Sequence, residues 1–274
     1  MMSPTQLSFV SLLAGNADAL YQALVEALVE ETNVAIRMVD TLDWHERRRL
    51  VETGNVDIAA ICGADYVRLA TRHPSPIALF AAPVMQGARY ASRPVYFSDI
   101  VVPMESPFQT FDDVVGARWV YNEPGSYSGY AAMRAYMANR GFSATFFSSA
   151  QQSGSHQASL TAVAHGEADV TAIDSIVLER ALHLDPALAT RIRTILAIGP
   201  NPVPPLVVGR HLSPTIAQRI DVAVRSMHQR ERGKRALDAA QIAHFVAVHD
   251  NDYHPIRRDL FHAQQGGAAA ATAP

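Results

Sequence analysis

Short apolar runs and longer helical runs alternate along the first third of the chain. Residues 7–13, 34–39 and 56–61 are short runs rich in Val, Ile, Leu and Ala, which predict buried strands. Residues 18–31 instead carry apolar side chains at helical spacing, and shorter helical segments follow the second and third runs. Strands and helices in this alternation predict a parallel sheet with helices on both faces.

The same alternation restarts after two longer strand-like runs, Ile77–Met85 and residues 94–102. The predicted helices are residues 111–115, 127–140, 156–165 and 175–183, and the predicted strands are Arg118–Tyr121 and residues 145–147, 169–173 and 192–198. The rigid, Pro-rich segment 199–205 marks a second crossing between units. We therefore expect lobe one from residues 1–100 with 200–274, lobe two from residues 101–199, and a flexible low-complexity tail over 264–274. A cleft at the hinge between two α/β lobes is a natural place for a ligand.

Composition narrows the class of protein. The chain has 274 residues, of which 49% are hydrophobic and 18% charged, and this is typical of a globular protein with a core. A net charge of −3 argues against a nucleic-acid surface, but local dipoles can still hold a small anion. The single cysteine, Cys62, excludes an intrachain disulfide. The scattered histidines predict no metal site, and no motif indicates a cofactor.

No segment shows the features of a membrane anchor or an export signal. No run approaches the ~18 apolar residues that span a bilayer. The first residues lack a basic region and a cleavage motif, so we expect no signal peptide in this sequence. The compartment stays open between the cytoplasm and an exported protein given without its signal.

The most informative stretch is Asn122-Glu123-Pro124-Gly125-Ser126-Tyr127-Ser128-Gly129-Tyr130, between a predicted strand and a predicted helix. Ser126, Tyr127 and Ser128 would lie at the helix N-terminus, where amide N–H groups lack partners and the dipole is positive. Such a place suits an anion with several oxygens. The alternative is that Ser126 or Ser128 only caps the helix.

Two further segments carry candidate ligand groups, and the first of them repeats the glycine–hydroxyl–helix pattern. Ser153-Gly154-Ser155-His156 precedes a helix, with His156 in its first turn, where its N–H could reach a ligand oxygen. Asp174 ends a predicted strand, and ligands of open α/β sheets bind beyond such ends. Asp174 could accept a hydrogen bond from a ligand hydroxyl and repel a fully ionised ligand. A purely structural His156 and an Asp174 that only caps the next helix are the alternatives.

Together these segments resemble the corresponding segments of a known protein family. "NEPGSYSGY", "SGSH", "ASLTAVAHGEADVTAIDS", "PVYFSDIVV" and "FVAVHDNDYHPIR" resemble, in order and spacing, the phosphate, phosphite and phosphonate substrate-binding proteins of ABC transporters. The resemblance covers residues from about 12 to 257. It implies a two-lobed type II periplasmic-binding-protein fold, in which each lobe is a mixed sheet flanked by helices. It also implies capture of a small phosphorus oxyanion for uptake, a permease as partner, a periplasmic or extracytoplasmic location, and a monomer.

By motif position, the resemblance implies a ligand shell of eight residues. Its members would be Ser126, Tyr127, Ser128, His156 and Asp174 from lobe two, Tyr96 from the hinge strand, and Asn16 and Cys62 from lobe one. The chain departs from the family at Tyr127, where the family often has Thr. A Tyr side chain is much bulkier, so Tyr127 either shrinks the pocket or turns away from it.

An enzyme and a sensor are the rival classes. Ser126 or Ser128 with His156 and Asp174 supplies the residue types of a nucleophilic triad. The stretch does not match Gly-x-Ser-x-Gly, however, because Tyr127 stands at its central position. A cytoplasmic enzyme on the same fold, acting on a small anionic metabolite, stays the runner-up to the binder. A sensor would bind the same ligand and report it to a separate partner.

Overall fold

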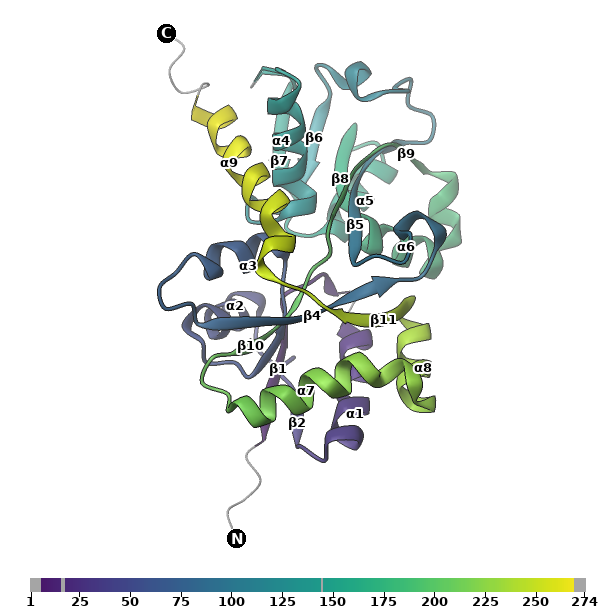
Figure 1. Cartoon of the computed structure of the whole chain (residues 1–274). Helices are drawn as coiled ribbons and strands as arrows, with labels where there is room; N and C mark the ends of the chain where they lie inside the picture. Colours follow the sequence, from purple (N-terminus) through teal and green to yellow (C-terminus); the bar gives the residue numbers. More distant parts are fainter. Residues whose placement is uncertain (1–5, 16–17, 144, 269–274) are drawn as a thin grey trace. The chain divides into compact units, whose positions relative to one another are not determined.

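The computed structural model describes residues 6–15, 18–143 and 145–268, and divides the chain into two compact units (Figure 1). The first unit holds the described residues up to Val95 together with Pro202–Tyr253. The second holds Tyr96–Asn201 and the residues that follow Tyr253. The chain therefore passes between the units three times. The predicted Asn16 lies outside the described residues.

The first unit is built on a six-stranded sheet with the order β11-β4-β10-β3-β1-β2. Its strands are β1 (Leu7–Ser11), β2 (Ile36–Met38), β3 (Ile58–Ala60), β4 (Ile77–Met85), β10 (Leu206–Gly209) and β11 (Ile242–Ala247). Its helices are α1 (Asp18–Thr32), α2 (Trp44–Thr53), α3 (Gly63–Ala70), α7 (Pro214–Ser226) and α8 (Glu231–Ala239). β1 pairs in parallel with β2 and β3, whereas β10 runs antiparallel to β3 and β4, so the sheet is mixed.

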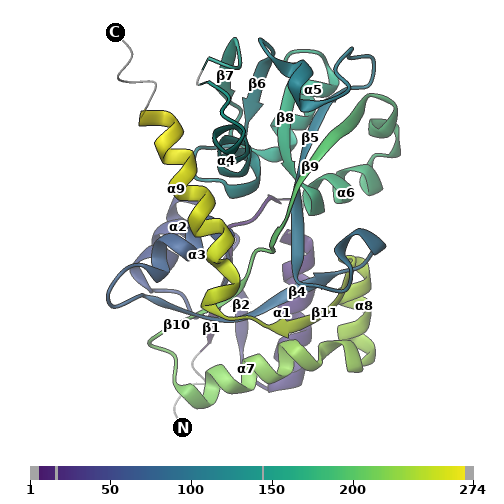
Figure 2. The same cartoon turned by 45° about the horizontal axis from the view of Figure 1, so that its top comes forward.

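The second unit is built on a five-stranded sheet with the order β7-β6-β8-β5-β9 (Figure 2). Its strands are β5 (Val95–Pro103), β6 (Arg118–Tyr121), β7 (Ser149–Gln152), β8 (Val170–Asp174) and β9 (Ile192–Pro202). Its helices are α4 (Ala132–Asn139), α5 (His156–Ala164), α6 (Ser175–Leu184) and α9 (His254–Ala268). β6 is parallel to β7 and β8, and β5 is antiparallel to β8, so this sheet is mixed too.

An aromatic core fills one side of the second sheet and explains one wrong strand prediction. Trp119 stacks on Tyr130, and Phe111 stacks on Phe146, each at an angle below 15°. We expected residues 145–147 to form a strand, but Phe146 and its neighbour are packed against this core. The strand is instead Ser149–Gln152, whose polar, largely exposed side chains give no hydrophobic signal.

The C-terminal segment differs from the expectation that it returns whole to lobe one. Helix α9 is grouped with the second unit and packs along α4 (Figure 1). Its anchors are the buried Ile256 and the mostly buried Asp259, which bonds to Tyr127 of the same unit. The helix extends to Ala268, so the first part of the expected flexible tail is helical, while residues 269–274 lie outside the described part.

Candidate anion-binding site

Three helix starts lie along one edge of the second sheet, which we call the helix-start edge. β7, β6 and β8 are parallel neighbours, so their carboxyl ends share an edge. β6 leads to a π-helical turn that begins at Tyr127, β7 leads to α5, and β8 leads to α6. Each helix start brings unsatisfied N–H groups and the positive end of a dipole. This edge is therefore suited to an anion.

The turn after β6 is held by the two predicted serines. The Ser126 hydroxyl accepts a hydrogen bond from the Gly129 N–H at 3.1 Å, and the Ser126 carbonyl accepts one from the Ala131 N–H at 3.1 Å. Ser98 of β5 donates its hydroxyl to the Ser128 carbonyl at 2.5 Å. Since the Ser126 oxygen only accepts among the described residues, its proton is available to a ligand. Ser126 thus caps the turn and can still donate.

Because Gly129 has no side chain, two polar side chains can lie directly against this turn. A Cβ at position 129 would lie 2.0 Å from Asn122 Oδ1 and 2.9 Å from His156 Cε1. Those separations are far below van der Waals contact, so only glycine fits without a shift of the neighbours. The close approach brings Asn122, at the end of β6, and His156, at the start of α5, to one place.

Both of these side chains carry a buried polar atom without a partner. Within the residues that the structure describes, His156 Nδ1 and Asn122 Oδ1 are buried and make no hydrogen bond. Burial lowers the pKa of His156 to about 4, so the ring is neutral at pH 7 and keeps one N–H. Unsatisfied buried polar groups are rare in folded proteins and indicate a missing partner such as a ligand or water.

Asp174 ends β8 and caps α6. Its Oδ1 accepts hydrogen bonds from the N–H groups of Ile176 at 2.8 Å and Val177 at 3.3 Å. Burial nevertheless raises its pKa to about 7, and the nearby negative charges of Asp99 and Glu179 add to the rise. The carboxyl group therefore gains or loses a proton near neutral pH, which suits a site whose ligand also carries a proton.

Asp174 is tied to the serine turn through β5. Ser98 lies opposite Asp174 in the β5–β8 ladder, and the same Ser98 donates to the Ser128 carbonyl. Ser126, Ser128, His156 and Asp174, which the sequence predicts from separate segments, therefore gather along one edge of one unit.

The predicted Tyr127 and Tyr96 are both fully buried. The Tyr127 hydroxyl lies 2.6 Å from Asp259 Oδ2 and 2.9 Å from Asn201 Oδ1. The two tyrosine rings are neighbours, with centroids 6.4 Å apart. The Tyr127 hydroxyl thus contacts both β9 and α9.

The remaining predicted residue belongs to the first unit. Cys62 directly precedes α3 and is half-buried. Sequence reasoning missed Asn122 and Ser98 as parts of this edge. Asn122 directly follows a strand, and this position is a usable signal. Ser98 carries no such signal, because only the antiparallel β5–β8 pairing brings it to the turn.

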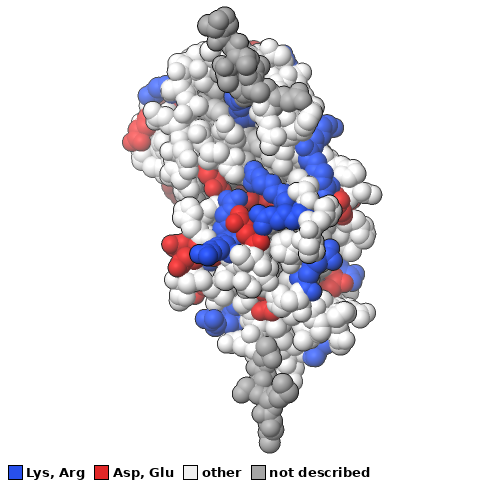
Figure 3. All heavy atoms as spheres, turned by 90° about the vertical axis from the view of Figure 1, so that its left-hand side faces the viewer, with Lys and Arg blue, Asp and Glu red and all other residues white. Residues whose placement is uncertain are grey.

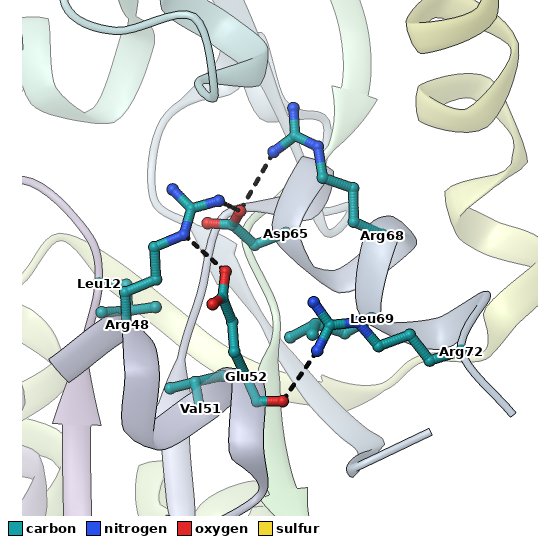
Figure 4. Close-up of a pocket in the computed structure, with 8 residues that line it drawn as sticks. All are labelled: Leu12, Arg48, Val51, Glu52, Asp65, Arg68, Leu69 and Arg72. Carbon is teal, nitrogen blue, oxygen red and sulfur yellow. Dashed lines mark hydrogen bonds and ion pairs between the residues drawn. The ribbon is translucent and has the colours of Figure 1, made fainter. Parts of the chain in front are cut away.

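A second place with a concentration of charge is a pocket of about 40 Å³ in the first unit (Figure 4). It is lined by Leu12, Arg48, Val51, Glu52, Asp65, Arg68, Leu69 and Arg72. Figure 3 shows basic and acidic side chains interleaved on the face that carries α2 and α3.

The described residues contain no cluster of His, Cys, Asp and Glu that could hold a metal.

The arginines of this pocket are already paired. Arg48 binds Glu52 at 2.9 Å and Asp65 at 3.0 Å, and Arg68 binds Asp65 at 3.2 Å. Arg72 donates to the Glu52 carbonyl at 2.9 Å. Burial raises the pKa of Asp65, and the two arginine charges oppose that rise. We therefore assign this cluster to joining α2 and α3 and not to ligand binding.

The comparisons with known proteins decide the family. The model of the family described as "ABC transporter, phosphonate, periplasmic substrate-binding protein" matches residues 12–253. The chain belongs to this family. Of the described helices, none is both long and apolar enough to cross a membrane. This phosphonate-binding family implies a small ligand and a transporter permease as partner.

Solved structures of related proteins have the same fold. A binding protein of a phosphonate ABC transporter from Pseudomonas aeruginosa is 19% identical, with a TM-score of 0.83, over 97% of this chain and 89% of that one. PhnD1 from Prochlorococcus marinus in complex with methylphosphonate is 16% identical, with a TM-score of 0.80, over 99% and 100%. The aliphatic sulphonate binding protein SsuA from Escherichia coli is 14% identical, with a TM-score of 0.64, over 98% and 89%. The predicted type II periplasmic-binding-protein fold is confirmed.

Proposed function

We propose that this member of the phosphonate-binding family captures a small phosphorus oxyanion, namely a phosphonate, phosphite or phosphate, outside the cytoplasm and delivers it to an ABC transporter permease. The observation that carries the proposal is the convergence of Ser126, Ser128, Asn122 and His156 on one turn, where buried polar atoms of two of them have no partner in the described part of the chain. An oxyanion that still carries a proton would satisfy both atoms, because one of its oxygens can accept from the His156 ring and its O–H can donate to Asn122 Oδ1.

Each residue has a distinct part in this proposal. The hydroxyl groups of Ser126 and Ser128, the main-chain N–H groups of the helix starts and the neutral ring of His156 donate to the anion. Asp174 accepts a hydrogen bond from an oxygen of the anion that carries a proton. Because the donors are neutral, they stabilise the anion through fixed dipoles and hydrogen bonds.

Asp174 also supports the choice of phosphorus over sulfur oxyanions. Phosphate, phosphite and phosphonates exchange a proton in aqueous solution near neutral pH, whereas sulfate and sulfonates are fully ionised there. A carboxyl group whose pKa is about 7 can share a proton with the first kind of ligand. In its ionised form it would repel the second kind, which has no proton to place between the two charges, and this discriminates between two ligands of similar shape.

The enzyme alternative depends on a nucleophilic triad, and the contacts do not support one. In a triad the acid accepts a hydrogen bond from the second nitrogen of the base. His156 Nδ1 has no hydrogen-bond partner among the described residues, and the Asp174 carboxylate accepts from the main chain of α6. These side chains are therefore better suited to binding than to nucleophilic catalysis.

A thermal-shift screen tests the proposal. The panel is phosphite, phosphate, methylphosphonate, aminoethylphosphonate, sulfate and molybdate. A ligand at 100 times its dissociation constant adds about 2.7 kcal/mol to the free energy of unfolding, which is about 5–10 °C for a chain of this size. We expect a shift with at least one phosphorus oxyanion and none with sulfate. Equal shifts with sulfate, or no shift with any anion, would exclude this function.

A further inference from the structure

The side chain of Tyr127 links the serine turn to two other elements of the second unit. Its hydroxyl lies 2.6 Å from the Asp259 carboxylate on α9 and 2.9 Å from the amide oxygen of Asn201 in β9. All three residues are at most 9% exposed. Asn201 is fixed in turn, because its amide donates to the Ile198 carbonyl at 2.9 Å.

The Tyr127 hydroxyl has no second proton that it could donate to a ligand. A phenol carries a single proton, and the shorter distance assigns that proton to the Asp259 carboxylate, which is the stronger acceptor. A buried hydrogen bond to a carboxylate is stronger than one between neutral groups. Turning Tyr127 toward a ligand would break this bond and leave Asp259 Oδ2 without its donor, so that among the described residues the carboxylate would keep only the ion pair of its Oδ1 with Arg258 at 3.5 Å.

The contacts of Tyr127 also lie at or near the three points where the chain enters or leaves the second unit. Tyr96, whose ring neighbours the Tyr127 ring, is the first residue after the first crossing. Asn201 is the last residue before the second crossing, and α9 begins directly after the third. These segments are far apart in sequence. Their contacts with the buried Tyr127 ring therefore fix the position of the serine turn.

We propose that Tyr127 is a positioning residue of the anion site, with Asp259 and Asn201 as its anchors, and that its hydroxyl does not contact the ligand. This inference rests on the proposed function for the identity of the ligand. It makes the C-terminal helix α9 a support of the serine turn. It also leaves Ser126 and Ser128 as the hydroxyl donors of that turn.

The first test needs no ligand. Hydrogen exchange is measured on the wild type and on Tyr127→Phe, Asp259→Ala and Asp259→Asn, with Tyr136→Phe as the matched control. Tyr136 is on α4, where its hydroxyl accepts a bond from Arg140 at 3.1 Å. The amides of Gly129 and Ala131, which bond to Ser126, should exchange about tenfold faster in Tyr127→Phe and Asp259→Ala. The amides of β8 should keep their rates.

Two results of the exchange experiment would overturn the inference. One is an unchanged rate at Gly129 and Ala131. The other is an equal acceleration of all protected amides in the second unit, because that indicates a general loss of stability without a specific effect on the turn. Asp259→Asn keeps an oxygen that accepts from Tyr127, so it should restore nearly wild-type rates.

The second test is the affinity for the phosphorus oxyanion that gives the largest thermal shift. Tyr127→Phe and Asp259→Ala should each weaken binding by about tenfold, and the double variant by no more than either single change, because both remove one bond. A loss in Tyr127→Phe with wild-type affinity in Asp259→Ala would make the hydroxyl a ligand contact and contradict the inference. Wild-type affinity in both would do the same. If the wild type binds no oxyanion, the proposed function fails, and hydrogen exchange alone decides the inference.

Discussion

The helix-start edge of the second unit and the arginine pocket of the first unit both collect polar groups, but they differ in how those groups are satisfied. In the pocket, Arg48, Arg68 and Arg72 each have a carboxylate or carbonyl partner within 3.2 Å. At the helix-start edge, His156 and Asn122 are buried with polar atoms that the described residues leave without a partner.

The comparison teaches that positive charge alone does not mark an anion site. The pocket holds more charge, yet its charges satisfy one another. The helix-start edge has neutral polar groups that gain a partner only when something binds. A protein with net charge −3 can therefore bind an anion without a basic surface.

The largest effect is expected from Gly129→Ala. The new Cβ would collide with Asn122 Oδ1 and His156 Cε1, so both side chains must move. A displacement of about 1 Å in a binding group costs on the order of 100-fold in function, and we expect a similar loss of oxyanion affinity by calorimetry. Gly141→Ala is the control, because it strains a backbone at φ +73° where no atom lies within 4 Å of the new Cβ. Comparable affinity losses in both variants would show that strain, and not the site, is responsible.

His156→Ala should weaken oxyanion binding by about 10–100-fold, since it removes one hydrogen bond to a charged group. The matched control is His165→Ala, which removes an exposed histidine at the other end of the same helix. Both affinities are measured by calorimetry at pH 7.5. If the two variants bind equally, His156 is a structural residue and the helix-start edge loses one of its donors.

The opposite pKa shifts of His156 and Asp174 predict a pH signature. From pH 4 to pH 6.5 the folded protein holds an extra proton on Asp174 and lacks one on His156, relative to the unfolded chain. Stability rises with pH where the unfolded state binds more protons, so the two contributions oppose each other in the wild type.

Replacing either residue should therefore reveal the contribution of the other one to the pH dependence of stability. Asp174→Asn leaves the His156 contribution, and stability should rise from pH 4 to pH 6.5 relative to the wild type. His156→Gln leaves the Asp174 contribution, and stability should fall from pH 4 to pH 7. Each slope change is at most about 1.4 kcal/mol per pH unit, measured by urea unfolding at several pH values. Parallel profiles for both variants would contradict these shifts.

The smallest effect on binding is expected from Asp65→Ala in the arginine pocket. Its loss removes the acceptor shared by Arg48 and Arg68, which are partly exposed, so the free energy of unfolding should fall by about 1–2 kcal/mol. Oxyanion affinity should stay within a factor of two of the wild type. A large loss of affinity would make the pocket part of the ligand site and reverse the comparison.

Much of the helix-start edge was predictable because its signals are local. Ser126, Ser155 and Asp174 stand directly before helices, and each of them caps the helix that follows. The strand–helix alternation places these caps at strand ends, and the rule for open sheets brings them to one edge.

The parts that escaped prediction depend on partners distant in the sequence or on exposed segments. Tyr127 and Asp259 are 132 residues apart, and no local pattern announces their bond. The same separation hid the grouping of α9 with the second unit. Strand β7 lies at a sheet edge with polar side chains, so it has no hydrophobic period to detect.

The most direct test of the central claim is the affinity of methylphosphonate, measured by calorimetry for three proteins. These are the wild type, the double variant Ser128→Ala with His156→Ala, and Arg48→Met. If neutral donors at the helix-start edge hold the anion, the double variant should lose at least 100-fold in affinity and Arg48→Met should match the wild type. Wild-type affinity in the double variant, or a comparable loss in Arg48→Met, would contradict the claim.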